Sequence, residues 1–269
     1  MLVDRFGRKI TYLRISVTDR CNYRCVYCMP EEGVELKPHA EMLSYEDMIN
    51  IASAAVELGI TKIRLTGGEP LIKRNIEFLV SSLAQIKGID DLTMTTNGSL
   101  LTVDKARDLQ EAGLQRVNIS LDTLDPKVFR KLTRGGDVRD VLKGIDAAKR
   151  AGLNPIKINM VIFADTSEDE ISAMRDFCRS KGLRLQTIMQ FSLYDRKRTL
   201  PVVTDRPPPC SACNRLRLTA DGYFLPCLFS DKELKVDLAD IKASILAAVR
   251  MKPKNGVSCR NRSMPQIGG

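Results

Sequence analysis

The sequence predicts an α/β fold: a partial (βα)6 barrel followed by a small C-terminal extension made of a hairpin and a helix. Over the first 191 of 269 residues, six apolar, strand-like runs alternate with amphipathic, helix-like stretches. Strands that alternate with helices pair in parallel through right-handed crossovers, and six such units favour an open barrel over a doubly wound sheet. The alternation then stops, so we expect a barrel over 1–191, a linker over 192–209 and an extension over 210–269.

The first predicted unit has a recognisable beginning and end. A strand over residues 11–17 runs into a loop rich in cysteine, and a helix follows over 44–58. Ser44 can cap that helix together with Asp47 three residues later, which is a partial capping box. Gly59 comes directly after the last helical residue and is a typical C-terminal stop.

The other elements follow from the same alternation. We expect strands at 62–66, 92–96, 116–121, 156–163 and 183–191, separated by helices at 74–86, 103–112, 126–132, 138–151 and 168–180. Beyond the linker, residues 215–225 are typical of a hairpin that turns at Asp221-Gly222. A last helix is expected over 240–251, and the tail over 252–269 is expected to be irregular.

Three cysteines follow the first predicted strand with the spacing C-x3-C-x2-C: Cys21, Cys25 and Cys28. Iron–sulfur clusters normally take four cysteine ligands, so three thiolates in one loop would leave one iron open. An open metal position is a reactive one. The alternatives are a zinc site or buried free thiols, and the spacing favours the cluster.

A second set, Cys210, Cys213 and Cys227, has the spacing C-x2-C-x13-C. Alone it would fit a zinc site with a borrowed ligand as well as an iron–sulfur cluster. Beside the first set, a second open cluster is favoured. We interpret Cys178 as a core thiol on a helix and Cys259 as a surface thiol, and assign a function to neither.

Composition narrows the class of partner. The formal net charge of +9 favours anionic partners such as nucleotides. Tryptophan is absent and aromatic residues are only 5%, which argues against a surface that stacks nucleic-acid bases. We see neither a membrane-spanning apolar stretch nor a signal-peptide core. Six of eight cysteines lie in metal-type sets, which suits the reducing cytoplasm better than a disulfide framework.

Polar residues gather where predicted strands end, which is where barrel enzymes place their chemistry. Asp19 and Asp122 are interpreted as structural partners of nearby arginines. The other residues that we expect to face the same mouth are Gly67-Gly68-Glu69-Pro70, Thr95-Thr96-Asn97, Ser120, Lys157 and Asn159.

At these residues the chain resembles the GTP 3′,8-cyclase family (molybdenum cofactor biosynthesis protein A) of the radical S-adenosylmethionine (SAM) superfamily. The first cysteine set, with Tyr27 just before its third member, marks the superfamily. The second set with Asn214-Arg215-x-Arg217, and the terminal Gly268-Gly269, are specific to the cyclase. Further matching stretches lie at 13–22, 63–71, 95–98, 117–122 and 157–159.

The resemblance implies a radical SAM lyase that converts GTP to (8S)-3′,8-cyclo-7,8-dihydroguanosine 5′-triphosphate, the first step of molybdenum cofactor biosynthesis. It implies two 4Fe-4S clusters, one on Cys21, Cys25 and Cys28 and one on Cys210, Cys213 and Cys227. SAM would be seated by Tyr27, Gly68, Glu69, Ser120 and Phe191. GTP would meet Arg14, Arg64, Thr95, Lys157, Arg215 and Arg217, and the catalytic set would be Arg215, Arg217, Gly268 and Gly269.

The same resemblance implies several partners, and the chain also differs from the usual family pattern in its C-terminal part. It implies an unidentified electron donor, a downstream cyclic pyranopterin synthase, no nucleic acid, no membrane, and a homodimer as one assembly. Family members usually carry several tens of residues more between the sixth strand and the second cysteine set. Gln186 stands where the family has a phosphate-facing arginine, and Phe191 where it has a cofactor-contacting methionine.

Two other functions compete with the cyclase. One is a radical SAM maturase that acts on another substrate and uses the second cluster for electron transfer. The other is a metal-bearing nucleic-acid-binding module, which the charge of +9 suggests. The six βα units and the Gly67-Gly68-Glu69-Pro70 loop argue against the module.

Overall fold

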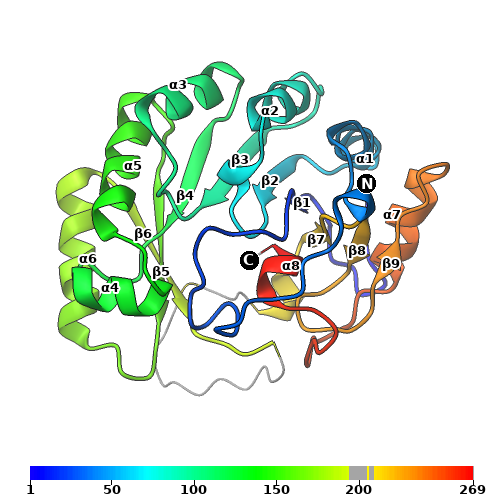
Figure 1. Cartoon of the computed structure of the whole chain (residues 1–269). Coiled ribbons are helices and arrows are strands. Elements are labelled where there is room, and N and C mark those ends of the chain that lie inside the picture. The colour runs from blue at the N-terminus through cyan, green and yellow to red at the C-terminus, as the bar shows by residue number, and fades with distance from the viewer. Residues whose placement is uncertain (194–204, 206–208, 269) are drawn as a thin grey trace.

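One curved sheet organises the chain (Figure 1), of which the computed structural model describes residues 1–193, 205 and 209–268. Its strand order is β6-β5-β4-β3-β2-β1-β7-β8-β9. The strands are β1 Tyr12–Ser16, β2 Lys62–Thr66, β3 Asp91–Thr96, β4 Arg116–Ser120, β5 Lys157–Ile162, β6 Arg184–Met189, β7 Arg215–Leu218, β8 Tyr223–Leu225 and β9 Leu234–Lys235. All pairs from β6 to β7 are parallel, and β7, β8 and β9 pair antiparallel.

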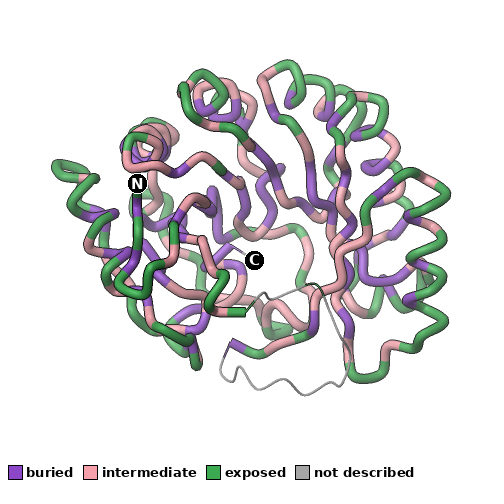
Figure 2. The backbone as a smooth tube through the Cα atoms, turned by 180° about the vertical axis from the view of Figure 1, so that it is seen from behind, coloured by how far each residue is buried: buried purple, intermediate pink, exposed green. Residues whose placement is uncertain are grey.

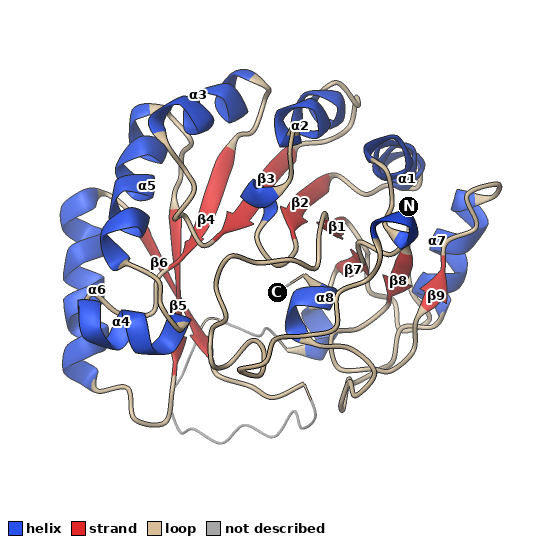
Figure 3. Cartoon of the chain, viewed as in Figure 1, coloured by secondary structure: helices blue, strands red, loops and turns tan. Residues whose placement is uncertain are grey.

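Helices cover the outer, convex face of the sheet (Figure 3). They are α1 Tyr45–Glu57, α2 Ile76–Ala84, α3 Val103–Glu111, α4 Pro126–Thr133, α5 Val138–Arg150, α6 Glu168–Lys181 and α7 Ile241–Arg250. The short α8 Met264–Ile267 lies instead on the concave side, near the C-terminus (Figure 1). The strands and the inward sides of the helices are buried, whereas the outward sides of the helices are exposed (Figure 2). The core therefore lies between the sheet and its outer helices, and the concave face is left for a site.

The predicted partial barrel and hairpin extension are confirmed. Helix α1 begins at a full capping box, since Ser44 and Asp47 each accept a hydrogen bond from the other's backbone N–H. Gly59 ends that helix with a φ of +107°, a conformation open to glycine at little cost. Helix α2 begins two residues later than expected, because Asn75 has a left-handed conformation that precedes its first turn.

Four features of the C-terminal part were not anticipated. Strand β7 pairs with β1 in parallel, so the sheet runs on into the extension, and β9 adds a further strand. The tail was predicted to be irregular, but it contains α8. The prediction of a surface thiol at Cys259 is wrong, because this residue is fully buried in a small core with Leu225 and Ile267.

The predicted linker falls mostly outside the described residues. Of 192–209, only Ser192, Leu193, Asp205 and Pro209 are described. The division into three regions therefore stays a prediction, although one sheet joins the first region to the last. Among the described residues, no helix combines the length and the apolar character needed to cross a membrane.

Candidate active site

The two cysteine sets lie at opposite ends of the central strand pair, β1 and β7. Strands β1 and β7 are parallel, with Tyr12 beside Arg215 and Arg14 beside Arg217. Cys21 follows the carboxyl end of β1, whereas Cys213 precedes the amino end of β7. Any ligand held by residues of these two strands would thus lie between the two sets.

The first cysteine set keeps three thiols without a disulfide, each partly exposed. The loop turns back through a hydrogen bond from the N–H of Cys28 to the carbonyl of Cys25, at 2.9 Å. Burial, followed by the charges of the neighbouring Asp122 and Cys21, raises the pKa of the Cys25 thiol to about 12. Burial, followed by Cys25 and Cys21, likewise raises the pKa of Cys28. A bound cationic centre would reverse this balance, because metals deprotonate the thiols that coordinate them.

The donor set fits a cluster better than a single metal ion. In the described part of the chain, no three His, Cys, Asp or Glu side chains are grouped so that they could hold one ion. A zinc ion draws its thiolates to about 2.3 Å. A four-iron cluster instead presents separate irons to separate thiolates, which suits three cysteines spread along a loop.

Within this loop, Tyr27 is held in place by Asp122. Its hydroxyl donates to a carboxylate oxygen of Asp122 at 2.7 Å, and the other oxygen of Asp122 accepts from the N–H of Val161 at 2.9 Å. The ring packs against Phe163, with centroids 5.6 Å apart. The interpretation of Asp122 as an arginine partner is therefore replaced by a tie between the cysteine loop and β5.

The Gly67-Gly68-Glu69-Pro70 loop packs against the chain that leads into the first cysteine set. A Cβ on Gly68 would lie 2.1 Å from the carbonyl oxygen of Arg20, and one on Gly67 would lie 2.5 Å from that of Thr18. The glycines thus allow two backbones to meet, as the hydrogen bond from Gly68 N–H to Thr18 at 2.8 Å shows. Seating of SAM by Gly68 stays a prediction.

Glu69 holds the same loop from inside. It is fully buried, and its carboxylate accepts from the N–H of Leu71, the hydroxyl of Thr96 and the N–H of Asn97. Burial raises its pKa to about 7, although these three hydrogen bonds act in the opposite direction. Asn97 in turn lies near Cys21, with Nδ2 to Sγ at 4.0 Å. Glu69 therefore connects β2 and β3 to the cysteine loop, and a contact with SAM stays a prediction.

Four arginines from three neighbouring strands face one another beneath the first set: Arg14, Arg64, Arg215 and Arg217. Burial, and then the charge of Arg217, lowers the pKa of Arg14 well below its ordinary value. Burial, and then Arg215, lowers the pKa of Arg217 to about 10. Buried, mutually repelling guanidinium groups are the pattern expected where an anion is to bind, because an anion offsets both effects.

Tyr12 lies in the middle of this cluster, and sequence reasoning missed it. The guanidinium carbons of Arg64 and Arg215 lie 5.6 and 5.8 Å from the centroid of its ring. Burial raises the pKa of its hydroxyl, but the four arginines outweigh burial and the net shift is downward. That hydroxyl is buried and forms no hydrogen bond within the described residues. Strand alternation places Tyr12 on the face of Arg14, a signal that was present in the sequence.

The C-terminal tail enters the concave side of the sheet, where the C-terminus lies in Figure 1. The carbonyl oxygen of Gly268 accepts from Arg14 at 3.0 Å and from Arg217 at 3.3 Å. A Cβ on Gly268 would lie 2.3 Å from the hydroxyl oxygen of Thr66. Gly268 therefore lies against two of the predicted site arginines, Arg14 and Arg217, whereas Gly269 lies outside the described residues; a role of the tail in catalysis stays a prediction.

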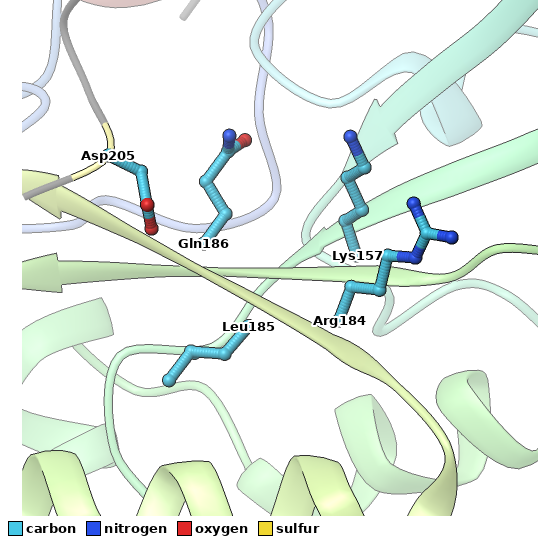
Figure 4. A pocket seen from close by; sticks show the side chains of 5 residues that line it. All are labelled: Lys157, Arg184, Leu185, Gln186 and Asp205. Carbon is cyan, nitrogen blue, oxygen red and sulfur yellow. The ribbon is translucent and has the colours of Figure 1, made fainter.

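The other predicted substrate residues line neighbouring strands of the same face. The hydroxyl of Thr95 is buried and finds no hydrogen-bond partner among the described residues. Lys157 lines a pocket of about 330 Å³ with Arg184, Leu185, Gln186 and Asp205, where its side chain extends beside that of Arg184 (Figure 4). Ser120 ends β4 next to Asn159 of β5. The neutral Gln186, which replaces the expected arginine, therefore shares a pocket with two cationic side chains, those of Lys157 and Arg184.

The second cysteine set is also free of disulfides. Burial raises the pKa of Cys227, whereas for Cys213 burial is outweighed, mainly by the charge of Lys252, and the pKa is lowered. A Cβ on Gly256 would lie 2.6 Å from Sγ of Cys227. Phe191, predicted to contact the cofactor, packs its ring at 5.2 Å from that of Phe229, two residues after Cys227. Phe191 is thus placed near the second set, and its contact with SAM stays a prediction.

Comparison with known proteins identifies the sequence family to which this chain is similar. Residues 15–178 match the Radical SAM superfamily. The GTP 3′,8-cyclase of Thermodesulfovibrio yellowstonii is 41% identical over 99% of both chains, and that of Petrotoga mobilis is 36% identical over 100% of both. The first alignment spans 322 positions against 269 residues here, so at least 53 aligned positions have no residue in this chain.

Solved structures support the fold. Streptococcus suis SuiB bound to precursor peptide SuiA has a TM-score of 0.70 and 17% identity, over 92% of this chain and 66% of SuiB. Native anSMEcpe with bound AdoMet has a TM-score of 0.67 and 16% identity, over 91% of this chain and 81% of its own. Both likenesses concern architecture alone.

Proposed function

The chain belongs to the radical SAM superfamily and, within it, to the GTP 3′,8-cyclases, and on that premise we propose that it cyclises GTP in the first step of molybdenum cofactor biosynthesis. The identity of 41% along nearly the whole length of a curated cyclase carries this proposal. The geometry supports it too, because Arg14 and Arg217 both donate hydrogen bonds to the carbonyl oxygen of Gly268 in the tail.

Two clusters and SAM would be held by the residues described above. A cluster on Cys21, Cys25 and Cys28, together with SAM, would supply the radical that starts the reaction. The chain's part is to hold that loop in place: Asp122 fixes Tyr27, and Glu69 fixes the backbone of Asn97 beside Cys21. Hard radical chemistry belongs to cofactors, whereas the protein orients and shields the reacting groups.

The arginine cluster suits the substrate. Guanidinium groups form paired hydrogen bonds with phosphate oxygens and keep their charge in buried sites. Arg14, Arg64, Arg215 and Arg217 would bind the anionic nucleotide from one side, and Lys157 and Thr95 would complete the site from β5 and β3. Holding the ribose still beside the cofactor is a proximity effect, which lowers the entropic part of the barrier.

The second set would hold a second cluster facing the guanine. Its position at the far edge of the β1–β7 pair supports this role, because GTP bound by the arginines would lie between the two clusters. Gly268 would keep Arg14 and Arg217 oriented through its carbonyl oxygen. Glycine suits this place, because no side chain fits between the tail and β2.

The partners belong to the same proposal. An electron donor must reduce the clusters, and a cyclic pyranopterin synthase would use the product. Reduced thiols at all the described cysteines suit a cytoplasmic location, and a homodimer stays a hypothesis. The alternative, a radical SAM maturase for another substrate, shares the fold but does not account for a cluster of four arginines, two of which contact the tail.

One experiment tests the proposal. The chain is reconstituted anaerobically with iron and sulfide, mixed with SAM, GTP and a reductant, and the nucleotide is analysed by mass spectrometry. We expect the cyclised triphosphate and 5′-deoxyadenosine from the wild type, and neither from Cys25→Ala. Formation of 5′-deoxyadenosine without any change in GTP would instead favour the maturase.

A further inference from the structure

A lysine at the end of α7 lies inside the molecule. Lys252 is 2% exposed, and its ammonium donates to the carbonyl oxygens of Arg215 and Pro226, both at 2.6 Å. Its Nζ also lies 3.9 Å from Sγ of Cys213. A buried ammonium is costly unless an opposite charge is near. None of the ion pairs found among the described residues includes Lys252.

The two carbonyls belong to the segments that carry the second cysteine set. Arg215 comes two residues after Cys213, and Pro226 comes directly before Cys227. One ammonium group therefore joins the chain that enters β7 to the chain that leaves β8. The segment that follows Lys252 completes the enclosure, because Gly256 packs directly against Sγ of Cys227.

A second cation, Arg8, contacts the chain at this set. Arg8 donates to the carbonyl of Cys210 at 2.8 Å and to that of Pro253 at 2.7 Å, and it pairs with Asp4. Because Asp4 is already paired with Arg8, the negative charge available to Lys252 is that of the thiolates. Cysteine thiolates carry that charge when they bind iron.

We propose that Lys252 is a positioning residue and the charge partner of the second cluster. Its ammonium fixes Cys213 and Cys227 relative to each other, and its charge favours the reduced, more negative state of the cluster. This inference rests on the proposed second cluster. Net charge and hydrogen bonding near the sulfurs are among the factors that set cluster potentials, and the groups around the ligands tune a metal site.

The test isolates the second cluster in the full chain. Changing Cys21, Cys25 and Cys28 to alanine removes the first cluster, so that iron and potential report on the second alone. In this background, Lys252→Gln keeps hydrogen-bond donors without the charge, Lys252→Arg keeps the charge, and Lys252→Met keeps neither. Lys254→Gln removes an exposed charge two residues away and serves as the matched control. Iron per chain and the midpoint potential are measured after anaerobic reconstitution.

We expect Lys252→Gln to keep its iron but to be harder to reduce, by about tenfold in the equilibrium constant, or about 59 mV for one electron. Lys252→Arg and Lys254→Gln should keep the parent potential, and Lys252→Met should lose iron. An unchanged potential in Lys252→Gln, or full iron in Lys252→Met, would overturn the inference while leaving the second cluster in place. If the background chain itself binds no iron, both the second cluster and the role of Lys252 are wrong.

Discussion

At the scale of single residues, the site is organised by buried polar groups that act on one another. Tyr12 is the clearest case, because its ring supports Arg64 and Arg215 while its hydroxyl forms no hydrogen bond within the described residues. A buried hydroxyl without a partner costs on the order of 1–3 kcal/mol. A ligand that accepts a hydrogen bond from it would remove that cost upon binding.

Tyr12→Phe tests whether the substrate accepts a hydrogen bond from this hydroxyl. The ring and its contacts with the arginines remain, so the stability of the substrate-free chain should be unchanged or slightly higher. Affinity for GTP should fall roughly ten- to a hundredfold, since a hydrogen bond to a charged group contributes roughly 1.5–3 kcal/mol. Equilibrium binding of GTP, triphosphate and guanosine shows which part of the nucleotide the hydroxyl meets.

Tyr45→Phe is the matched control for Tyr12. Tyr45 begins the outer helix α1, and its hydroxyl donates to the carbonyl of Arg74 at 2.8 Å, outside the arginine cluster. Removal of this hydroxyl should lower the stability of the chain slightly and leave its affinity for GTP unchanged. Equal affinity for GTP in wild type and Tyr12→Phe would show that the hydroxyl does not contact the substrate.

At the scale of elements, the tail is the part whose placement depends most on the rest of the fold. Helix α8 ends at Gly268, whose φ is +79°, and Arg262 anchors the segment before it through Asp221 at 2.8 Å and Glu233 at 2.8 Å. These ion pairs are largely buried and tie the tail to the β8 and β9 region. Gly268 is thereby placed against Arg14 and Arg217.

Gly268→Ala should unseat the tail. The new Cβ would lie 2.3 Å from the Thr66 hydroxyl oxygen and 3.1 Å from Cβ of Ser16, in a backbone conformation that alanine resists by about 1–2 kcal/mol. We expect cyclised product to fall at least about tenfold, whereas iron content and 5′-deoxyadenosine formation persist. Deleting Gly268 and Gly269 should give the same split between the two products.

Gly152→Ala provides the control for backbone strain alone. Gly152 has a φ of +78°, and nothing lies within 4 Å of a Cβ placed there. It should lose similar stability and keep the full rate of cyclisation. If Gly268→Ala cyclises GTP as fast as the control does, the tail is not part of the reaction.

The elements also show where sequence reasoning reaches its limit. Strands β1 to β6 and their helices were predicted, because apolar periodicity and caps such as Ser44 are local signals. The pairing of β7 with β1 was not, since about 200 residues separate Tyr12 from Arg215 and no local pattern encodes that contact. Lys252 and the buried Cys259 were missed for the same reason, because their surroundings come from distant segments.

At the scale of the whole molecule, the parallel pairing of β1 and β7 sets the distance and order of the two cysteine sets. Five residues of β1 span roughly 15 Å at about 3.3 Å per residue. The first set lies beyond one end of this strand and the second near the other, with the arginines between them. The fold therefore predicts two metal sites that form independently and meet different ligands.

Two cysteine variants separate these sites. Changing Cys21, Cys25 and Cys28 to alanine should leave about four irons per chain, and so should changing Cys210, Cys213 and Cys227. Because Arg215 and Arg217 come two and four residues after Cys213, GTP should perturb the paramagnetic resonance spectrum of the reduced second cluster. SAM should perturb only the first cluster, whose loop contains Tyr27 and lies beside Asn97. A GTP effect on the first cluster with none on the second would place the substrate at the wrong edge of the sheet. It would also remove the reason for a second cluster in this fold, since a cluster beyond reach of the nucleotide could only pass electrons.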